Sequence, residues 1–236
     1  MQLNKNLIKT NFKKNFLTYE QNAIAQKESA HRLISLINRK NFNKVLEIGS
    51  YSGFLTRLTI ENINCQSYLA LDIVEESEFA IKKINPKIDF LNYDVEEFNT
   101  SDKFDLILSN ASLQWCNSLP DTIKKLKSFL DEKGIMALSI FQKGNLNEIK
   151  DAFGVGLNYP NLKEIKNMFS KRAKIIELDK VLQFATPVEI LKHLKYTGVT
   201  SLNNNRLPVS NLKEGIKILK EKYNNKITYK SVIIID

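Results

Sequence analysis

The chain has little of what marks several whole classes of protein. Its 236 residues include only two cysteines, two histidines and one tryptophan. Cys65 and Cys116 have no CxxC partner and no nearby histidine, so we expect reduced, buried thiols and no metal site. No apolar run approaches the roughly 18 residues that a membrane helix needs. The basic, Asn-rich segment 1–19 lacks the apolar stretch of a secretory signal. These absences predict a cytoplasmic protein.

Positive charge is present in excess, and it is concentrated in one part of the chain. The composition is 43% hydrophobic and 26% charged, enough for a buried core, and the formal net charge is +9. Residues 161–230 hold 15 Lys and Arg against 6 Asp and Glu, whereas the remainder holds 20 of each sign. A basic lobe indicates an acidic partner, or else only a solvated helix surface. Nucleic acid is not favoured, because few aromatic residues are interleaved with these lysines for base stacking.

Strand and helix patterns alternate through the first two thirds of the chain. Short apolar runs predict strands at 44–48, 67–71, 88–91, 105–109 and 135–141, and helical periods predict helices at 53–62, 75–84 and 121–130. An amphipathic helix is expected at 19–37, ahead of the first strand. This alternation predicts an α/β fold with a parallel sheet that is covered on both faces.

The last third of the chain departs from this alternation. Helical stretches near 146–153 and 162–169 precede a long strand pattern at 173–184, two helices at 187–196 and 210–223, and a final strand at 227–235. We therefore divide the chain into an N-terminal helical cap (1–40), a core (41–185), a basic helical insertion (186–225) and a last core strand (226–236).

The turn after the first strand is the most specific motif. Residues 45–53 run from a strand into a turn that carries Gly49 and Gly53, and such turns face the ligand crevice of open α/β sheets. The GxGxxG spacing of dinucleotide sites is absent. Glu47 would repel a pyrophosphate but suits the ammonium group of S-adenosylmethionine (AdoMet). The other interpretation is a tight β–α turn without a ligand.

Two further acids follow the next two strands. Asp72 is placed to accept hydrogen bonds from both ribose hydroxyls, and Asp94 to accept one from an adenine amino group. A single Asp after a strand is more often a helix cap or a turn residue. Three carboxylates at three successive strand ends nevertheless favour AdoMet as the cofactor.

The stretch 44–141 resembles the class I methyltransferases. Their first cofactor motif matches Glu47, Gly49 and Gly53, and the resemblance assigns the ribose contact to Asp72 and the adenine side to Asp94 and Val95. It implies a Rossmann-like sheet that is mostly parallel, with an antiparallel last strand, helices on both faces and a helical lid before that strand. The family usually has a third glycine where this chain has Tyr51, a residue that must project away from the pocket or cover the cofactor.

Nearly the whole chain is similar to a narrower family, the malonyl-[acyl-carrier protein] O-methyltransferases of biotin synthesis. The matching positions are Phe12, 19–21, Gln26, 109–115, 194–200, Arg206 and 227–229. The resemblance implies that Tyr19 and Asn110 bind the cofactor, that Gln114 and Trp115 line the substrate pocket, and that Arg206 or Lys195 positions the substrate carboxylate. Three of these residues also have a purely structural interpretation: Tyr19 as a helix anchor, Asn110 as a turn former and Trp115 as a core residue.

The implied substrate, a malonyl group on acyl carrier protein, needs no catalytic acid or base because its carboxylate is already ionised at neutral pH. This agrees with a chain in which His31 and His193 are expected at the surface or in helix packing. Two alternatives remain open: a methyltransferase for another small carboxylic acid or for RNA, and a non-catalytic AdoMet-fold binding protein.

Overall fold

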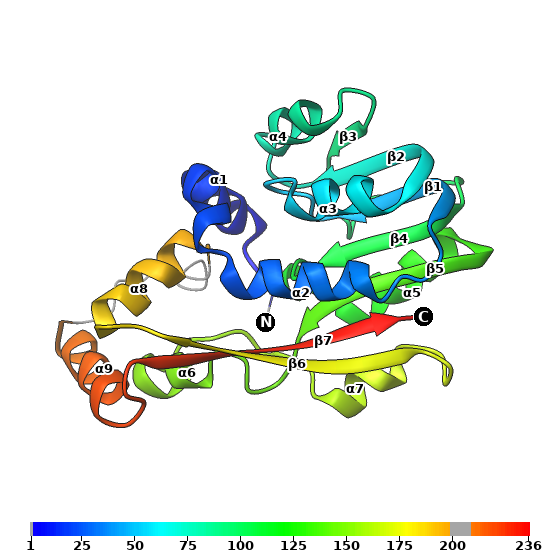
Figure 1. Ribbon diagram of the computed structural model, residues 1–236. Helices are drawn as coiled ribbons and strands as arrows, with labels where there is room; N and C mark the ends of the chain where they lie inside the picture. Colours follow the sequence, from blue (N-terminus) through cyan, green and yellow to red (C-terminus); the bar gives the residue numbers. More distant parts are fainter. Residues whose placement is uncertain (1, 199–208) are drawn as a thin grey trace.

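A twisted sheet forms the centre of the molecule (Figure 1). The computed structural model describes residues 2–198 and 209–236. Within them, seven strands pair in the order β3-β2-β1-β4-β5-β7-β6. The strands are β1 (Asn41–Ile48), β2 (Asn64–Asp72), β3 (Asp89–Asn92), β4 (Phe104–Asn110), β5 (Leu130–Phe141), β6 (Lys174–Gln183) and β7 (Lys226–Ile235). β1 to β5 are parallel and β7 is antiparallel to both of its neighbours, which confirms the predicted sheet.

Helices cover both faces of the sheet. They are α1 (Lys5–Asn22), α2 (Ile24–Ser35), α3 (Phe54–Asn62), α4 (Ser77–Ile84), the 3-10 turn η1 (Leu113–Trp115), α5 (Leu119–Phe129), α6 (Asn147–Phe153), α7 (Leu162–Asn167), α8 (Pro187–Tyr196) and α9 (Val209–Glu221). Buried side chains of α2, α3 and α4 form the core on one face, and those of α5 and the α7 region form it on the other. The central strands are buried on both faces, as their continuous apolar runs predict.

The N-terminal region differs from the prediction of one helix at 19–37. The structure has two helices there, and the chain turns at Ala23, whose φ of −78° and ψ of 51° are not helical. The first helix, α1, was not predicted. Its sequence is largely polar, and Ile8 is its buried residue, so it has little of the apolar periodicity that identifies an amphipathic helix. In Figure 1, α1 lies beyond the carboxyl ends of the parallel strands.

The end of the molecule that carries α8 and α9 has a core of its own. β7 pairs with β5 only through Ser231–Ile235, and its first half pairs with β6 alone as a two-stranded ribbon. α6, α8 and α9 pack on this ribbon around a third apolar cluster that includes Phe141, Ile190 and Leu219. α8 and α9 fall within the predicted insertion at 186–225; its role as a lid stays a prediction.

Both cysteines are free, but they are half-buried rather than buried as expected. Burial raises the pKa of the Cys116 thiol to about 11, so it is a poor nucleophile at neutral pH. None of the helices in the described ranges has both the length and the apolar character that a membrane span requires. In the same ranges, no three His, Cys, Asp or Glu side chains gather as metal ligands would.

Candidate active site

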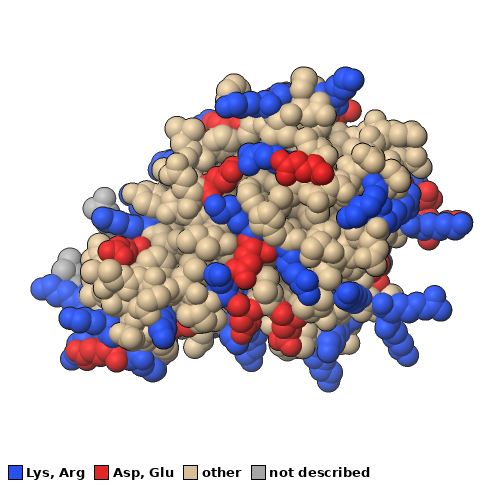
Figure 2. All heavy atoms as spheres, viewed as in Figure 1, with Lys and Arg blue, Asp and Glu red and all other residues tan. Residues whose placement is uncertain are grey.

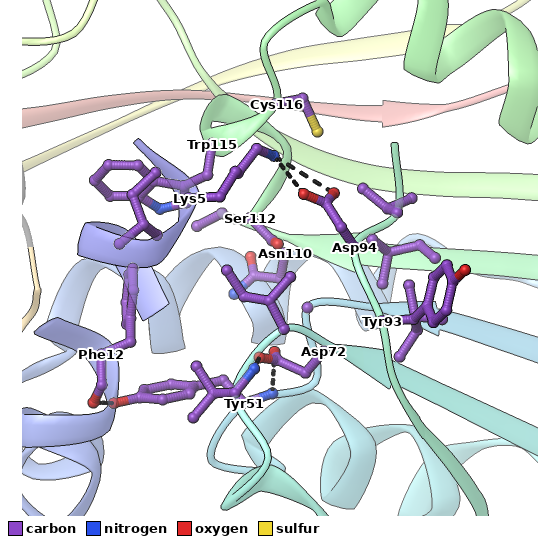
Figure 3. A pocket seen from close by; sticks show the side chains of 18 of the residues that line it. Lys5, Phe12, Tyr51, Asp72, Tyr93, Asp94, Asn110, Ser112, Trp115 and Cys116 are labelled. Carbon is purple, nitrogen blue, oxygen red and sulfur yellow. Dashed lines mark hydrogen bonds and ion pairs between the residues drawn. The ribbon is translucent and has the colours of Figure 1, made fainter. Parts of the chain in front are cut away.

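A cavity opens where the parallel strands end, at the edge that the sequence predicts for a ligand (Figure 3). It encloses about 650 Å³ of empty space, its open mouth included. α1 closes one side. The walls of the cavity come from α1, from the carboxyl ends of β1, β2, β3 and β4 with the turns after them, and from η1 with the residue after it; they are Lys5, Ile8, Phe12, Tyr19, Ile48, Gly49, Tyr51, Leu71, Asp72, Ile73, Val74, Tyr93, Asp94, Val95, Asn110, Ala111, Ser112, Trp115 and Cys116.

Asp72 lies at the end of β2 and forms part of the cavity wall. Its Oδ2 accepts a hydrogen bond from the backbone N–H of Tyr51 at 2.9 Å, and its Oδ1 accepts one from that of Val74 at 2.8 Å. Burial raises its pKa to about 6, against the opposing effect of these hydrogen bonds. The carboxylate is thus held in place at the cavity wall, where a ligand hydroxyl would meet it.

Glu47, near the end of β1, is fully buried behind the cavity wall and does not line it. Its Oε2 accepts hydrogen bonds from the hydroxyls of Thr56 at 2.6 Å and Tyr68 at 2.5 Å, and its Oε1 has no partner. Burial raises its pKa to about 7. An unpartnered carboxylate oxygen beneath the Gly49 turn fits a cationic group, as the ammonium of AdoMet would supply.

The two glycines of the first turn have different tasks. Gly49 has a φ of +75°, and a Cβ there would lie 2.0 Å from Ser112 Oγ and 2.4 Å from Ser112 Cβ. Its lack of a side chain lets the turn after β4 close over the turn after β1. Gly53, with a φ of +76°, precedes α3; a Cβ there would lie 2.4 Å from Ile84 Cδ1. Since Gly53 does not line the cavity, its contact is with α4, and its predicted cofactor role stays a prediction.

Tyr51, which stands where the resembling family has glycine, has a left-handed φ of 37°, a backbone conformation that costs a side chain about 1–2 kcal/mol. Its ring is 8% exposed and packs edge-on against Phe12, Phe16 and Tyr19. Its hydroxyl donates to the Phe12 carbonyl oxygen at 2.6 Å (Figure 3). Tyr51 thus joins the cofactor turn to α1, and Tyr19 lies in the wall as expected.

Asp94 and Val95 line the cavity, and their contact with adenine stays a prediction, but Asp94 already has a partner. Lys5 of α1 forms an ion pair with Asp94 Oδ2 at 3.0 Å (Figure 3), and another with Glu96 Oε2 at 2.6 Å. Sequence reasoning missed Lys5 and the role of α1 as a wall, because ion pairs across about ninety residues leave no local pattern. An adenine amino group would share Asp94 with this ammonium.

Asn110, at the end of β4, uses its side chain to hold α2. Its Nδ2 donates to the Gln26 carbonyl oxygen at 2.9 Å, and its Oδ1 accepts from Ser29 Oγ at 2.7 Å. Both amide ends are therefore engaged, so what Asn110 offers a ligand is mainly its backbone. Trp115 lines this cavity and also a second, smaller one that includes Gln114.

The cations predicted to position a substrate are not in the described walls. Lys195 is exposed on α8 and lines none of the described cavities. Arg206 lies outside the described residues. His31 is exposed. His193 packs inside, where its Nε2 lies 2.9 Å from the hydroxyl of Tyr229 and burial lowers its pKa to about 4. His193 is therefore neutral at pH 7.

Comparisons with known proteins agree with this geometry. The family described as a methyltransferase domain matches residues 19–197, most of the chain. The chain belongs to the methyltransferase family. A malonyl-[acyl-carrier protein] O-methyltransferase of Calditerrivibrio nitroreducens is 38% identical to it, with 82% of this chain and 80% of the relative covered. Another, of Haemophilus influenzae, is 30% identical, with coverages of 89% and 84%.

A solved structure shares the fold. A putative methyltransferase of Bacillus halodurans superposes with a TM-score of 0.67 at 10% identity, with 87% of this chain and 96% of that one covered. At this identity the likeness concerns the fold alone. The predicted resemblance to the methyltransferases, and to their malonyl-[acyl-carrier protein] branch, is confirmed.

Proposed function

We propose that this protein transfers a methyl group from AdoMet to the free carboxylate of a malonyl thioester on acyl carrier protein. The methyl ester would then prime pimeloyl synthesis for biotin. One observation carries the proposal: Glu47 and Asp72, buried at the ends of β1 and β2, flank a glycine turn over the cavity. The name shared by the relatives points to the substrate.

The reaction requires little acid–base catalysis from the protein. When bound, AdoMet supplies an electrophilic methyl group on a positively charged sulfur. The malonyl carboxylate is already anionic at neutral pH, so no side chain has to remove a proton from it. The residues of this chain would align the carboxylate oxygen with the methyl carbon and exclude water. The neutral His193 and the scarcity of histidine fit this role.

In the cofactor cavity, we assign the ribose to Asp72, the adenine to Asp94 and Val95, and the ammonium to Glu47. Gly49, Gly53, Tyr19 and the backbone of Asn110 would complete this set, with Gln114 and Trp115 on the substrate side. Lys195 or Arg206, in or beside the insertion, would hold the carboxylate if the insertion closes as a lid. Arg206 is the better candidate because a guanidinium pairs two donors with one carboxylate.

The basic end of the molecule supplies a surface for an acidic carrier protein. Figure 2 shows Lys and Arg side chains gathered where α8 and α9 lie, with few acids among them. Lys213 and Lys217 are exposed one turn apart on α9, and neither forms an ion pair in the part of the chain that the structure describes. Such a surface would speed encounter with an acidic protein through long-range attraction.

Mass spectrometry of malonyl-acyl carrier protein incubated with the enzyme and AdoMet tests the proposal. We expect the carrier to gain one methyl group, and fragmentation of the released acyl chain should place it on the terminal carboxylate. Acetyl-acyl carrier protein, which has no free carboxylate, is the matched control and should gain nothing. A titration with AdoMet separates the alternatives: binding without transfer to any carboxylate or RNA would identify a non-catalytic binding protein.

A further inference from the structure

A second cavity adjoins the cofactor cavity on its substrate side. It encloses about 340 Å³, its opening included, and shares Phe12, Tyr19, Ala111 and Trp115 with the cofactor cavity. These four residues therefore form the boundary across which a methyl group would pass. The remaining walls come from α2, η1, the end of β5 and the segment after it, the segment between α6 and α7, the residue after α8, and β7, which are far apart in the chain.

We call this cavity the amide chamber, after three side-chain amides in its wall: Gln26, Gln114 and Asn145. Each has a buried polar atom without a hydrogen-bond partner, namely Gln26 Oε1, Gln114 Oε1 and Asn145 Nδ2. A buried polar atom without a hydrogen-bond partner destabilises the folded state, so folded proteins rarely keep one without a reason. Three of them around one small cavity indicate a polar ligand.

Asn145 is the member whose orientation is fixed. Its Oδ1 accepts a hydrogen bond from the backbone N–H of Lys230 at 2.9 Å, so the Nδ2 group is the end left over. The residue is 5% exposed. Next to it in the wall is the Tyr159 hydroxyl; burial raises the pKa of this phenol to about 12, an effect that the Asn145 amide partly offsets. The Asn145 amide has two N–H donors, so one of them stays available to a ligand beside the Tyr159 hydroxyl even where the other faces the phenol oxygen.

The chamber contains no charged side chain among its described lining residues. Behind it, the neutral His193 hydrogen-bonds Tyr229, a further wall residue. Neutral donors suit a carboxylate that must lose its charge during the reaction. As the carboxylate oxygen forms its bond to the methyl carbon, the methyl–sulfur bond breaks and its electron pair stays on sulfur. A strong cationic grip would favour the charged starting state over this transition state.

We propose that the amide chamber holds the malonyl end of the substrate, with Asn145 Nδ2 donating a hydrogen bond to the carboxylate that becomes methylated. The inference rests on the proposed function and adds to it a positioning residue that the sequence did not indicate. Asn145 would orient the carboxylate from inside the chamber, in addition to the cation, Arg206 or Lys195, that the proposed function assigns to it.

The test compares Asn145→Asp with wild type on pantetheine thioesters, which leave out the carrier protein and its surface. Asp keeps the acceptor for the Lys230 N–H but replaces the donor with a like charge. We expect kcat/KM for malonyl-pantetheine to fall about 30-fold or more. The inhibition constant of acetyl-pantetheine, which has no carboxylate, should change less than about threefold, and AdoMet affinity should stay unchanged. Asn147→Asp, the same substitution at an exposed position two residues away, should behave as wild type.

A second variant protects the test against a folding defect. Tyr159→Phe removes one hydroxyl and introduces no charge, and it should lower kcat/KM for malonyl-pantetheine about 3- to 10-fold, with acetyl-pantetheine inhibition unchanged. If both variants keep the wild-type preference for malonyl over acetyl thioesters, the chamber does not bind the carboxylate and the inference is wrong. If the wild type itself methylates no malonyl thioester, it is the proposed function that fails.

Discussion

The cofactor cavity and the amide chamber share part of a wall but differ in the side chains that surround them. The cofactor cavity gathers charge: Asp72 and Asp94 project into it, Glu47 lies behind its wall, and Lys5 pairs with Asp94. The chamber has neutral amides and phenols. The ribose, adenine and ammonium groups of AdoMet do not change in the reaction, so fixed charges can hold them throughout. A carboxylate that loses its charge in the reaction is better held by neutral donors, since these do not stabilise its ionised form as strongly.

The largest expected effect is a loss of ligand binding in the cofactor cavity alone. Gly49→Ala should weaken AdoMet binding about 100-fold or more, because the new Cβ would overlap Ser112 and the φ of +75° is strained for alanine. Calorimetry measures this. Gly154→Ala, with a similar φ of +67° and nothing within 4 Å of its new Cβ, controls for backbone strain and should leave AdoMet affinity unchanged.

A compensating change sharpens the same test. Ser112→Gly in the Gly49→Ala background removes both of the overlapping side-chain atoms and should recover part of the lost AdoMet affinity. Equal AdoMet binding by Gly49→Ala and wild type would show that the turn after β1 does not form the cofactor site.

Asp72→Ala should weaken AdoMet binding by about 1–3 kcal/mol, the cost of hydrogen bonds lost from a charged acceptor. Asp72 also accepts from the backbone of Tyr51 and Val74, so the turn itself should loosen. The affinity for malonyl-pantetheine should stay unchanged, because Asp72 does not line the amide chamber. Asp89→Ala, an exposed acid at the start of β3, is the control. Unchanged AdoMet affinity in Asp72→Ala would reduce Asp72 to a turn residue.

The pH dependence of binding should differ between the two cavities. Below the Glu47 pKa of about 7 this carboxyl is mostly protonated, and an ammonium favours the ionised form. AdoMet affinity should therefore rise roughly fivefold as pH increases from about 6 to about 7.5. Asp72, with a pKa of about 6, should contribute at the lower end. Glu47→Gln should bind AdoMet more weakly, and its AdoMet affinity should change much less with pH.

Over the same pH interval, the inhibition constant of a malonyl thioester in the absence of AdoMet should stay constant, because the chamber has no group that titrates there. A malonyl thioester whose affinity follows that of AdoMet would contradict the division into a charged cavity and a neutral chamber.

The smallest effect concerns neither cavity. Lys213→Glu with Lys217→Glu should raise KM for malonyl-acyl carrier protein several-fold and leave both AdoMet affinity and kcat/KM for malonyl-pantetheine unchanged. Added salt should weaken the wild type similarly, because exposed charges are screened over about 8–10 Å. Lys83→Glu with Lys87→Glu, an exposed pair of the same spacing at α4, is the control. A salt-insensitive KM would indicate apolar docking.

A variant in the insertion tests whether the insertion or the amide chamber holds the substrate carboxylate. Arg206→Ala should lower kcat/KM for malonyl-acyl carrier protein about 10²-fold if this residue holds the carboxylate, and Arg206→Lys should recover only part of it. AdoMet affinity should hardly change. A normal turnover in Arg206→Ala, beside a defect in Asn145→Asp, would place the recognition of the carboxylate in the chamber alone.

The sequence by itself determined the sheet and one of the two cavities. Strand ends that carry Glu47, Asp72 and Asp94 are local patterns, and parallel topology brings such ends to one edge. The tertiary structure decided the rest. Lys5 reaches Asp94 across the cavity, Asn110 holds α2, and the chamber takes Gln26, Gln114 and Asn145 from three separate segments. Amides in polar segments look like ordinary surface residues in a sequence. Only the fold shows which of their atoms are buried without a partner, because that depends on contacts between residues far apart in the chain.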